Sequence, residues 1–231
     1  MLEVNEVVAG YGGVPVLQGV SLRVQSKRVC VVLGPNGAGK STLAKAVVGL
    51  LPVMSGTVSL DGRDITGLPP YELVRLGVGY MPQLMNVFAD MTILENLEMG
   101  AYTYTGDIRS RLGEVLELFP DLRANPRKRA DQLSGGQQRM LALARALMID
   151  PQVIILDEPT AGLAPVYTAQ VWDQVVRIRN RGVGLIVVEQ NVRAAISHAD
   201  NAVVLTSGRV TMEGSAADIA ANAELGEMLV S

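Results

Sequence analysis

Hydrophobic residues follow two strand-like patterns along this chain. In residues 20–25 and 57–61, apolar and polar side chains alternate, and a period of two predicts antiparallel strands with one face in water. Four other segments are unbroken apolar runs, namely residues 29–33, 153–156, 185–188 and 202–205. Such runs are typical of strands covered on both faces, as in a parallel sheet between helices. We therefore expect a parallel core with a small antiparallel sheet near the N-terminus.

Residues 92–147 have a mainly helical pattern, with polar breaks at 105–107 and 125–127. Late in this segment an apolar stripe recurs at helical spacing, formed by Met140, Leu143, Ala144 and Leu147. Pro151 predicts the end of that helix before the next apolar strand. The expected fold is α/β in one domain, residues 1–231, with a helical insertion at about 86–147 between core segments 1–85 and 148–231.

Composition narrows the class of protein. Of the 231 residues 48% are hydrophobic, yet no run approaches the roughly 18 to 20 apolar residues that a membrane-spanning helix needs. The first residues lack a basic segment followed by an apolar one, so no secretion signal is expected. One cysteine excludes an internal disulfide and fits a reducing cytoplasm. The net charge of −3 argues against nucleic acid as the main partner.

A glycine-rich motif follows the first buried strand and precedes a helix-like segment that runs from Thr42 to Gly49. Its residues are Gly34, Pro35, Asn36, Gly37, Ala38, Gly39, Lys40 and Ser41. Glycines let backbone N–H groups converge on a polyphosphate, and the helix start adds its positive dipole. Lys40 would reach the terminal phosphates and Ser41 would ligate Mg²⁺. The alternative is a strand-to-helix turn that needs glycine for its geometry alone.

Two acidic residues, Asp157 and Glu158, end a later apolar run. Open α/β sheets bind ligands at the carboxyl ends of their strands. Because adjacent strand residues point to opposite sides, the two carboxylates can do different work. Asp157 suits the Mg²⁺ shell and Glu158 suits an attacking water. A charged pair at a strand end, without a function, is the other interpretation.

The string Leu133 to Arg139 opens the striped helix. Ser134 is a suitable N-cap, and Gly135 and Gly136 leave backbone N–H groups unobstructed, so that anion binding is possible. A plain glycine-bearing helix entry would look similar. The chain already has its own phosphate loop, however, and a second anion site suggests a nucleotide shared between two chains.

These motifs, in this order, resemble those of ABC transporter ATPases, whose signature peptide matches Leu133 to Gln137. The resemblance spans essentially the whole chain and implies a P-loop NTPase (RecA-like) core, with ATP and Mg²⁺ as cofactors. It also implies a head-to-tail dimer, in which Ser134, Gly135, Gly136 and Gln137 of one subunit close over the γ-phosphate held by the other. By the same resemblance Gln83 senses Mg²⁺ and the nucleophilic water, and Tyr11 stacks on adenine.

The chain departs from the family at two positions. Gln190 stands where most relatives have a histidine that contacts the γ-phosphate, and Ala164 stands where an aspartate usually ends the loop after Glu158. A glutamine amide can still donate a hydrogen bond but carries no charge. His198, the one histidine, is expected to lie on a helix face and not to take this role.

Both departures resemble the branched-chain amino acid branch of importers, as does the segment 95–102. The string Leu84-Met85-Asn86 differs from that branch, which leaves the solute open. The resemblance implies a second ATPase subunit, identical or paralogous, and transmembrane permease subunits. A solute-binding protein would take part indirectly, and the chain would lie on the inner face of the cell membrane. Urea or a short amide is an alternative solute.

A non-transport ABC ATPase of DNA repair or translation is a further alternative. Gly136 follows Lys40 by only 96 positions, which leaves no room for the long coiled coil of repair proteins, and the chain has one cassette where translation factors usually have two. The basic string at 127–129 is interpreted as a solvated surface.

Overall fold

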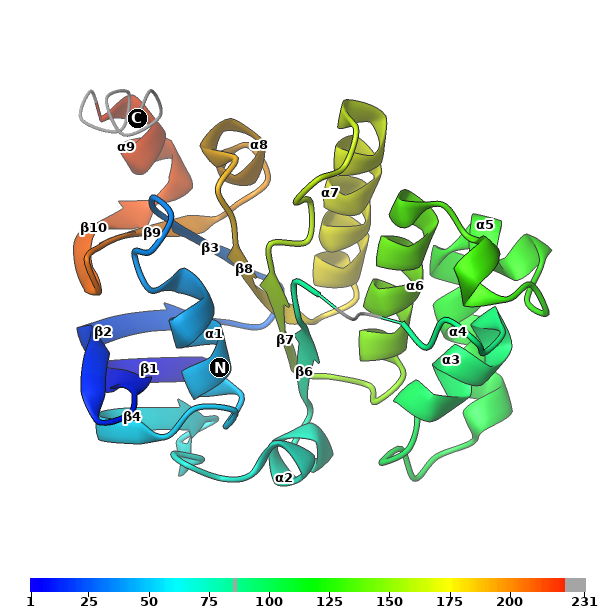
Figure 1. Cartoon of the computed structure of the whole chain (residues 1–231), viewed down its shortest axis with the longest axis horizontal. Helices are drawn as coiled ribbons and strands as arrows, with labels where there is room; N and C mark the ends of the chain where they lie inside the picture. The colour runs from blue at the N-terminus through cyan, green and yellow to red at the C-terminus, as the bar shows by residue number, and fades with distance from the viewer. Residues whose placement is uncertain (85–86, 223–231) are drawn as a thin grey trace.

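The computed structural model describes residues 1–84 and 87–222. Figure 1 shows two sheets beside each other, with a group of helices, α3 to α6, on the side away from the antiparallel sheet. Within the described ranges, no helix has the length and apolar character needed to cross a membrane.

The first sheet is antiparallel and has the strand order β2-β1-β4-β5. Its strands are β1 (Leu2–Tyr11), β2 (Val14–Val24), β4 (Val53–Leu60) and β5 (Arg63–Asp64). Side chains such as Val4, Val20 and Val58 are buried. The predicted antiparallel strands at 20–25 and 57–61 are thus confirmed within β2 and β4, which both pair with β1.

The second sheet has the order β10-β9-β3-β8-β7-β6 and is parallel except for β10. Its strands are β3 (Val29–Leu33), β6 (Val78–Met81), β7 (Val153–Asp157), β8 (Gly184–Val188), β9 (Asn201–Thr206) and β10 (Arg209–Ser215). Each of the four apolar runs is a strand, and β3, β7 and β8 are buried along their whole length. The parallel core is therefore confirmed.

Successive residues of β3 enter different cores, as the alternation of side chains in a strand requires. Val31 packs in a cluster with Trp172 of α7 (Pro165–Asn180), whereas Val32 packs in a cluster with Leu43 of α1 (Lys40–Val47) and with the antiparallel sheet. The helices α1, α6 (Gly135–Leu147) and α7 contribute to this cover. The remaining helices are α2 (Pro70–Arg75), α3 (Ile93–Gly100), α4 (Ile108–Leu118), α5 (Pro120–Ala124), the 3₁₀ turn η1 (Ala130–Gln132), α8 (Val192–Ile196) and α9 (Ala216–Ala221).

The helical segment has the expected punctuation. Asp107, in the first predicted break, caps α4 by accepting a hydrogen bond from the N–H of Arg109, and the break at 125–127 separates α5 from η1. In α6 the stripe residues Leu143, Ala144 and Leu147 are buried. The division of the chain at residues 85 and 86 lies outside the described residues, and the domain boundaries stay a prediction.

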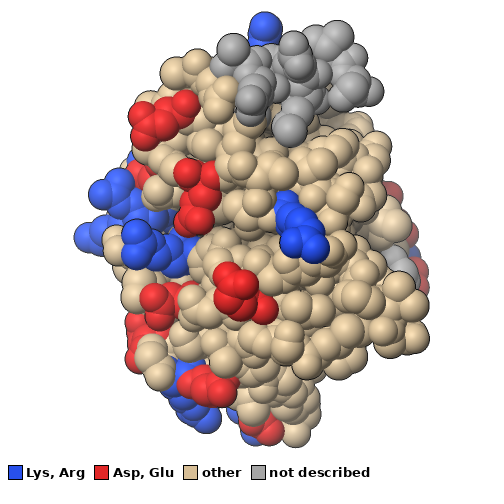
Figure 2. Space-filling model, turned by 90° about the vertical axis from the view of Figure 1, so that its left-hand side faces the viewer, with Lys and Arg blue, Asp and Glu red and all other residues tan. Residues whose placement is uncertain are grey.

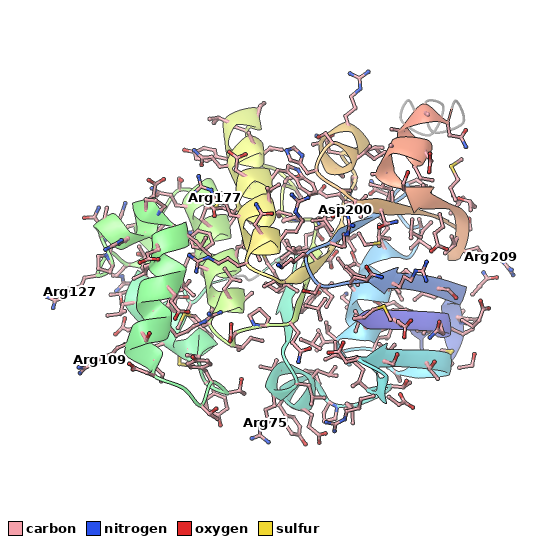
Figure 3. All side chains as sticks on the ribbon, turned by 180° about the vertical axis from the view of Figure 1, so that it is seen from behind. Arg75, Arg109, Arg127, Arg177, Asp200 and Arg209 are labelled. Atoms are coloured by element: carbon pink, nitrogen blue, oxygen red, sulfur yellow. The ribbon has the colours of Figure 1, made fainter. Side chains whose placement is uncertain are left out.

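Charged side chains of both signs are interspersed on the face that carries the antiparallel sheet (Figure 2). In Figure 3, Arg127 of the basic string points away from the helical group, and it is exposed.

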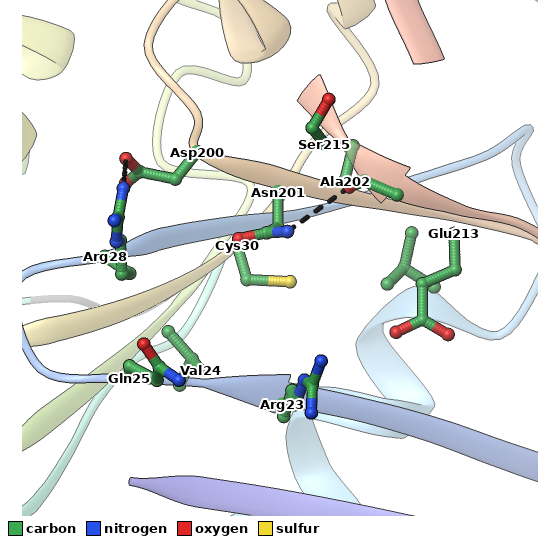
Figure 4. A pocket seen from close by; sticks show the side chains of 12 residues that line it. Arg23, Val24, Gln25, Arg28, Cys30, Asp200, Asn201, Ala202, Glu213 and Ser215 are labelled. Carbon is green, nitrogen blue, oxygen red and sulfur yellow. Dashed lines mark hydrogen bonds and ion pairs between the residues drawn. The ribbon is translucent and has the colours of Figure 1, made fainter. Parts of the chain in front are cut away.

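A pocket of about 570 Å³ lies between β2, β3, β9 and β10, with Cys30 on its wall and the Arg28–Asp200 ion pair at 2.8 Å (Figure 4). None of the residues lining it belongs to the predicted nucleotide site.

Candidate functional site

The predicted phosphate loop connects β3 to α1, and its glycines have individual structural reasons. Gly34 has φ 147°, and a Cβ there would lie 2.1 Å from the carbonyl oxygen of Leu205. Gly39 has φ 101° and a Cβ would lie 2.9 Å from Leu17. Gly37 has φ 78° but faces open space. Gly34 is therefore required by packing against backbone as well as by its own conformation, whereas Gly37 and Gly39 are required by backbone conformation, the Cβ at Gly39 meeting only the end of the Leu17 side chain.

Lys40 is buried at the first turn of α1, with 5% of its surface exposed. Its Nζ donates to the carbonyl oxygens of Gly34 at 2.8 Å and Pro35 at 2.9 Å. Burial lowers the pKa of Lys40, and the nearby carboxylates of Glu158, Asp157 and Glu189 oppose that shift. The ammonium group is thus held inside the loop that would surround a phosphate chain.

Ser41 and Asp157 meet across the sheet edge. The Ser41 hydroxyl donates to Asp157 Oδ1 at 2.9 Å, and the Tyr80 hydroxyl lies 3.4 Å from Oδ2. Burial raises the pKa of the Asp157 carboxyl, while the hydrogen bond from Ser41 lowers it. A hydroxyl and a carboxylate fit Mg²⁺, which binds through one or two protein oxygens and completes its shell with water and phosphate.

Glu158 lies directly after β7 in a strained conformation, with φ 49°. Its N–H donates to the carbonyl oxygen of Val188 at 2.9 Å, which pins it to β8. Its carboxylate accepts from Gln83 Nε2 at 2.5 Å and from Gln190 Nε2 at 2.5 Å. Gln83 and Gln190, which lie 75 and 32 positions from Glu158 in the sequence, therefore converge on one carboxylate. The structure brings together the three side chains that the sequence singled out for catalysis.

The second anion site lies at the start of α6. Ser134 caps this helix as expected, because its Oγ accepts from the Gln137 N–H, and the Gln137 side chain accepts in turn from the Ser134 N–H. In the described part of the chain, the N–H groups of Gly135 and Gly136 have no hydrogen-bond acceptor. Two donors at a helix start, with Ser134 and Gly135 exposed, form a suitable anion site.

This second site is not joined to the phosphate loop of its own chain. Among the described residues, no hydrogen bond connects 134–137 with 34–42. Ser134 and Gly135 instead face solvent.

Tyr11 ends β1 at a tight hairpin, as expected, because Gly12 and Gly13 have φ of 58° and 81°. Its ring is half exposed, and Lys45 Nζ of α1 lies 6.0 Å from the ring centroid. An exposed aromatic ring beside the helix that follows the phosphate loop can stack on a base.

His198 corrects the sequence interpretation. It lies in the turn after α8, which ends at Ile196, and not on the helix itself. The imidazole stacks on Trp172 with ring centroids 5.2 Å apart, and its Nδ1 lies 2.8 Å from the carbonyl oxygen of Ala194.

Sequence reasoning missed three polar residues around the site. Arg139 Nη1 donates to the carbonyl oxygen of Gln83 at 2.7 Å, and the buried Glu189 accepts from Thr160. Only Glu189 left a signal, as an acidic residue directly after an apolar run; the contacts of all three join segments far apart in sequence.

Comparison with known proteins places this geometry in a family. Residues 17–161 match the family described as ABC transporter. The chain is 42% identical to a probable branched-chain amino acid transport ATP-binding protein, LivF, of Archaeoglobus fulgidus, over 95% of this chain and 94% of that one. It is 38% identical to the corresponding high-affinity protein of Pseudomonas aeruginosa, BraG, over 96% of both. A lipopolysaccharide export ATP-binding protein of Escherichia coli K12 is 32% identical over 94% of this chain and 92% of that one.

Solved structures agree. The ADP conformation of MJ1267, an ATP-binding cassette of an ABC transporter, has a TM-score of 0.91 at 27% identity and covers 100% of this chain and 98% of its own. A dimeric bacterial cassette, MJ0796, has a TM-score of 0.81 at 26% identity over 94% and 99%. The expected P-loop NTPase fold is confirmed. The chain belongs to the ABC transporter family, as an ATP-binding subunit that hydrolyses ATP.

Proposed function

We propose that this chain drives import of branched-chain or similar hydrophobic amino acids, by hydrolysing Mg²⁺-ATP at two sites shared by a head-to-tail dimer. The observation that carries the solute class is the likeness, over almost the whole chain, to two proteins named for branched-chain amino acid transport. The ATP chemistry rests on the hydrogen-bonded cluster around Asp157 and Glu158.

Residues 34–42 hold the phosphates. On ATP binding, Lys40 exchanges the carbonyl oxygens of Gly34 and Pro35 for β- and γ-phosphate oxygens, which are stronger acceptors because they are charged. Ser41, Asp157 and Gln83 would hold Mg²⁺, which would neutralise phosphate charge. Tyr11 stacks on the adenine.

Glu158 orients the attacking water. Its carboxylate accepts from the amides of Gln83 and Gln190, so its position is fixed from two sides. Gln190 also donates to the γ-phosphate, where it takes the place of the usual histidine. Ser134, Gly135, Gly136 and Gln137 of the other subunit close the site, because the N–H groups of Gly135 and Gly136 have no acceptor in the described part of their own chain and can bind an anion.

Arg139 links hydrolysis to movement of the helical group. It lies in the first turns of α6 and holds the backbone of Gln83 at 2.7 Å, next to the Glu158 contact. A displacement of α6 therefore moves the loop that contacts Glu158. The permease subunits would be driven through this loop, on the inner face of the cell membrane, and a solute-binding protein would deliver the solute from outside.

Another solute is the second candidate. Cassettes of amino acid transport and of lipopolysaccharide export are similar to this chain at 42% and 32% identity. Urea and short amides also remain as solutes for the same motor. In each case the ATP site would act in the same way, because the solute contacts lie in other chains.

Isolation of the tagged chain from detergent-solubilised membranes tests the proposal. We expect a permease to co-purify, and expect leucine, with its binding protein, to stimulate ATP hydrolysis by the complex reconstituted in liposomes. Stimulation by urea with none by leucine would overturn the solute assignment. A chain that co-purifies only with ribosomes or DNA would overturn the transport role.

A further inference from the structure

Glu189 is a buried carboxylate that the mechanism above does not use. It directly follows β8, and only 2% of its surface is exposed. Burial raises the pKa of its carboxyl, and hydrogen bonds from Thr160, Gln190 and Asn191 counteract that shift. Placing a carboxylate in such a site is unfavourable unless its oxygens are well satisfied. Its hydrogen-bond partners therefore indicate what it does.

Those partners belong to two different loops. Oε1 accepts from the N–H of Thr160 at 3.0 Å and from the Thr160 hydroxyl at 2.7 Å. Oε2 accepts from the N–H of Gln190 at 3.1 Å. The Glu189 backbone is itself fixed, because its N–H donates to the carbonyl oxygen of Val32 in the neighbouring strand at 3.1 Å. One carboxylate thus joins the loop after β7 to the loop after β8.

Both loops also include a residue that lies close to Glu158 in the sequence or contacts it. Thr160 lies two positions after Glu158, and the exposed side chain of Gln190 donates to the Glu158 carboxylate at 2.5 Å. A glutamine side chain has several rotatable bonds and loses conformational entropy when it is held in one place. Its amide can remain on Glu158 only where the backbone that carries it is fixed. The hydrogen bond to Glu189 supplies that restraint.

We propose that Glu189 is a positioning residue for ATP hydrolysis, which ties the backbone of Gln190 to Thr160 and so keeps the Gln190 amide on Glu158. This inference rests on the proposed roles of Glu158 and Gln190. The Gln190 amide, which is neutral and flexible and replaces a histidine, is thus held in place through the neighbouring residue Glu189.

The variant Glu189→Gln has nearly the same shape but one acceptor oxygen fewer. The N–H groups of Thr160 and Gln190 face the two oxygens, so an amide must turn its NH₂ toward one of these donors. We expect kcat to fall about 10- to 100-fold, the size of effect that follows misplacement of a reacting group. The KM for ATP and the Kd of a fluorescent ATP analogue should stay within about 3-fold, a change too small to indicate a lost binding contact.

A double-mutant cycle separates positioning from other effects. In the Gln190→Ala background, Glu189→Gln should lower kcat by less than about 3-fold, because the amide that it positions is gone. Glu189 also lies close enough to influence Lys40, and an effect through charge alone would persist in that background. A fall of equal size in both backgrounds therefore overturns the proposal. Glu213→Gln, at an exposed position of β10, is the matched control and should keep the parental kcat.

Thr160→Val provides a second route if Glu189→Gln does not fold. It removes the 2.7 Å hydroxyl bond to the Glu189 carboxylate but leaves the Thr160 N–H in place. We expect kcat to fall about 3-fold, less than for Glu189→Gln because the backbone N–H still holds Oε1. That fall should disappear in Gln190→Ala; an unchanged fall refutes the positioning role. Failure of the proposed function is a different outcome, in which Glu158→Gln hydrolyses ATP as fast as the parent.

Discussion

Two neighbouring glycines at the start of α6 are expected to respond differently to alanine. A Cβ at Gly136 would lie 2.4 Å from Cδ1 and 2.6 Å from Cγ of Tyr167 in α7. A Cβ at Gly135 would have no heavy atom within 4 Å. Gly136 is thus required by packing within the chain, whereas nothing in the described part of the chain requires Gly135.

The expected free energies follow from these distances. Gly136→Ala forces the Tyr167 ring or the two helices apart, and such overpacking costs about 1 to 3 kcal/mol. Gly135→Ala adds a helix-favouring residue without a clash and should change the free energy of unfolding by between zero and about 1 kcal/mol in the stabilising direction. For a chain of this size, 1 kcal/mol shifts Tm by about 2 to 4 °C. Thermal unfolding of the purified variants should therefore separate them.

The order should reverse in an assay of dimer formation by ATP. In the proposed dimer the Gly135 backbone approaches the γ-phosphate held by the other subunit, and the methyl group of Gly135→Ala would obstruct that approach. Size-exclusion chromatography with light scattering should show an ATP-dependent dimer for Glu158→Gln and none for Glu158→Gln/Gly135→Ala. Equal destabilisation by the two alanines, or an undiminished dimer with Gly135→Ala, would refute this account of the helix start.

Three further outcomes are expected. Burial raises the pKa of Cys30 to about 12 from 9.0, so the native thiol should resist iodoacetamide at pH 8 and react only after unfolding. Because the thiol of the unfolded chain ionises at lower pH than the native thiol, Cys30 should also lower the free energy of unfolding as pH rises from 9 to 12. Tyr11→Ala should weaken ATP binding by about 1 to 3 kcal/mol while Tyr11→Phe does not, because stacking needs only the ring; equal calorimetric Kd values for both would remove Tyr11 from the adenine site. Ser41→Ala removes the 2.9 Å bond to Asp157, and a Mg²⁺ titration of ATP hydrolysis should shift to higher concentration; an unchanged midpoint would contradict the metal role.

Local patterns in the sequence were enough for most of the fold. The buried strands were predictable because a strand covered on both faces must be apolar at every position, as in β3, β7 and β8. Strand β6 was not predicted, because Val78–Met81 is only four residues long and includes a glycine. Its assignment depends on pairing with β7, which no local pattern shows.

The site divides in the same way. Each of the segments 34–42 and 134–137 is one continuous stretch of sequence, so its residue types and their spacing were enough to predict its chemistry. Glu189 and Thr160 are 29 positions apart, and Arg139 and Gln83 are 56 apart. Such contacts form where separate loops pack together at one edge of the sheet, and they cannot be predicted from the pattern of a single sequence.

Glu158→Gln tests the central claim, that one carboxylate held by two amides carries hydrolysis. The substitution replaces one carboxylate oxygen, which accepts from the Gln83 or the Gln190 amide, by an NH₂ group, and it leaves the size of the side chain nearly unchanged. We expect ATP turnover to fall about 10²- to 10⁴-fold, with the Kd for ATP within about 3-fold of the parent, since the phosphate loop is untouched. Turnover near the parental rate, with the variant folded and binding ATP, would contradict the assignment of Glu158.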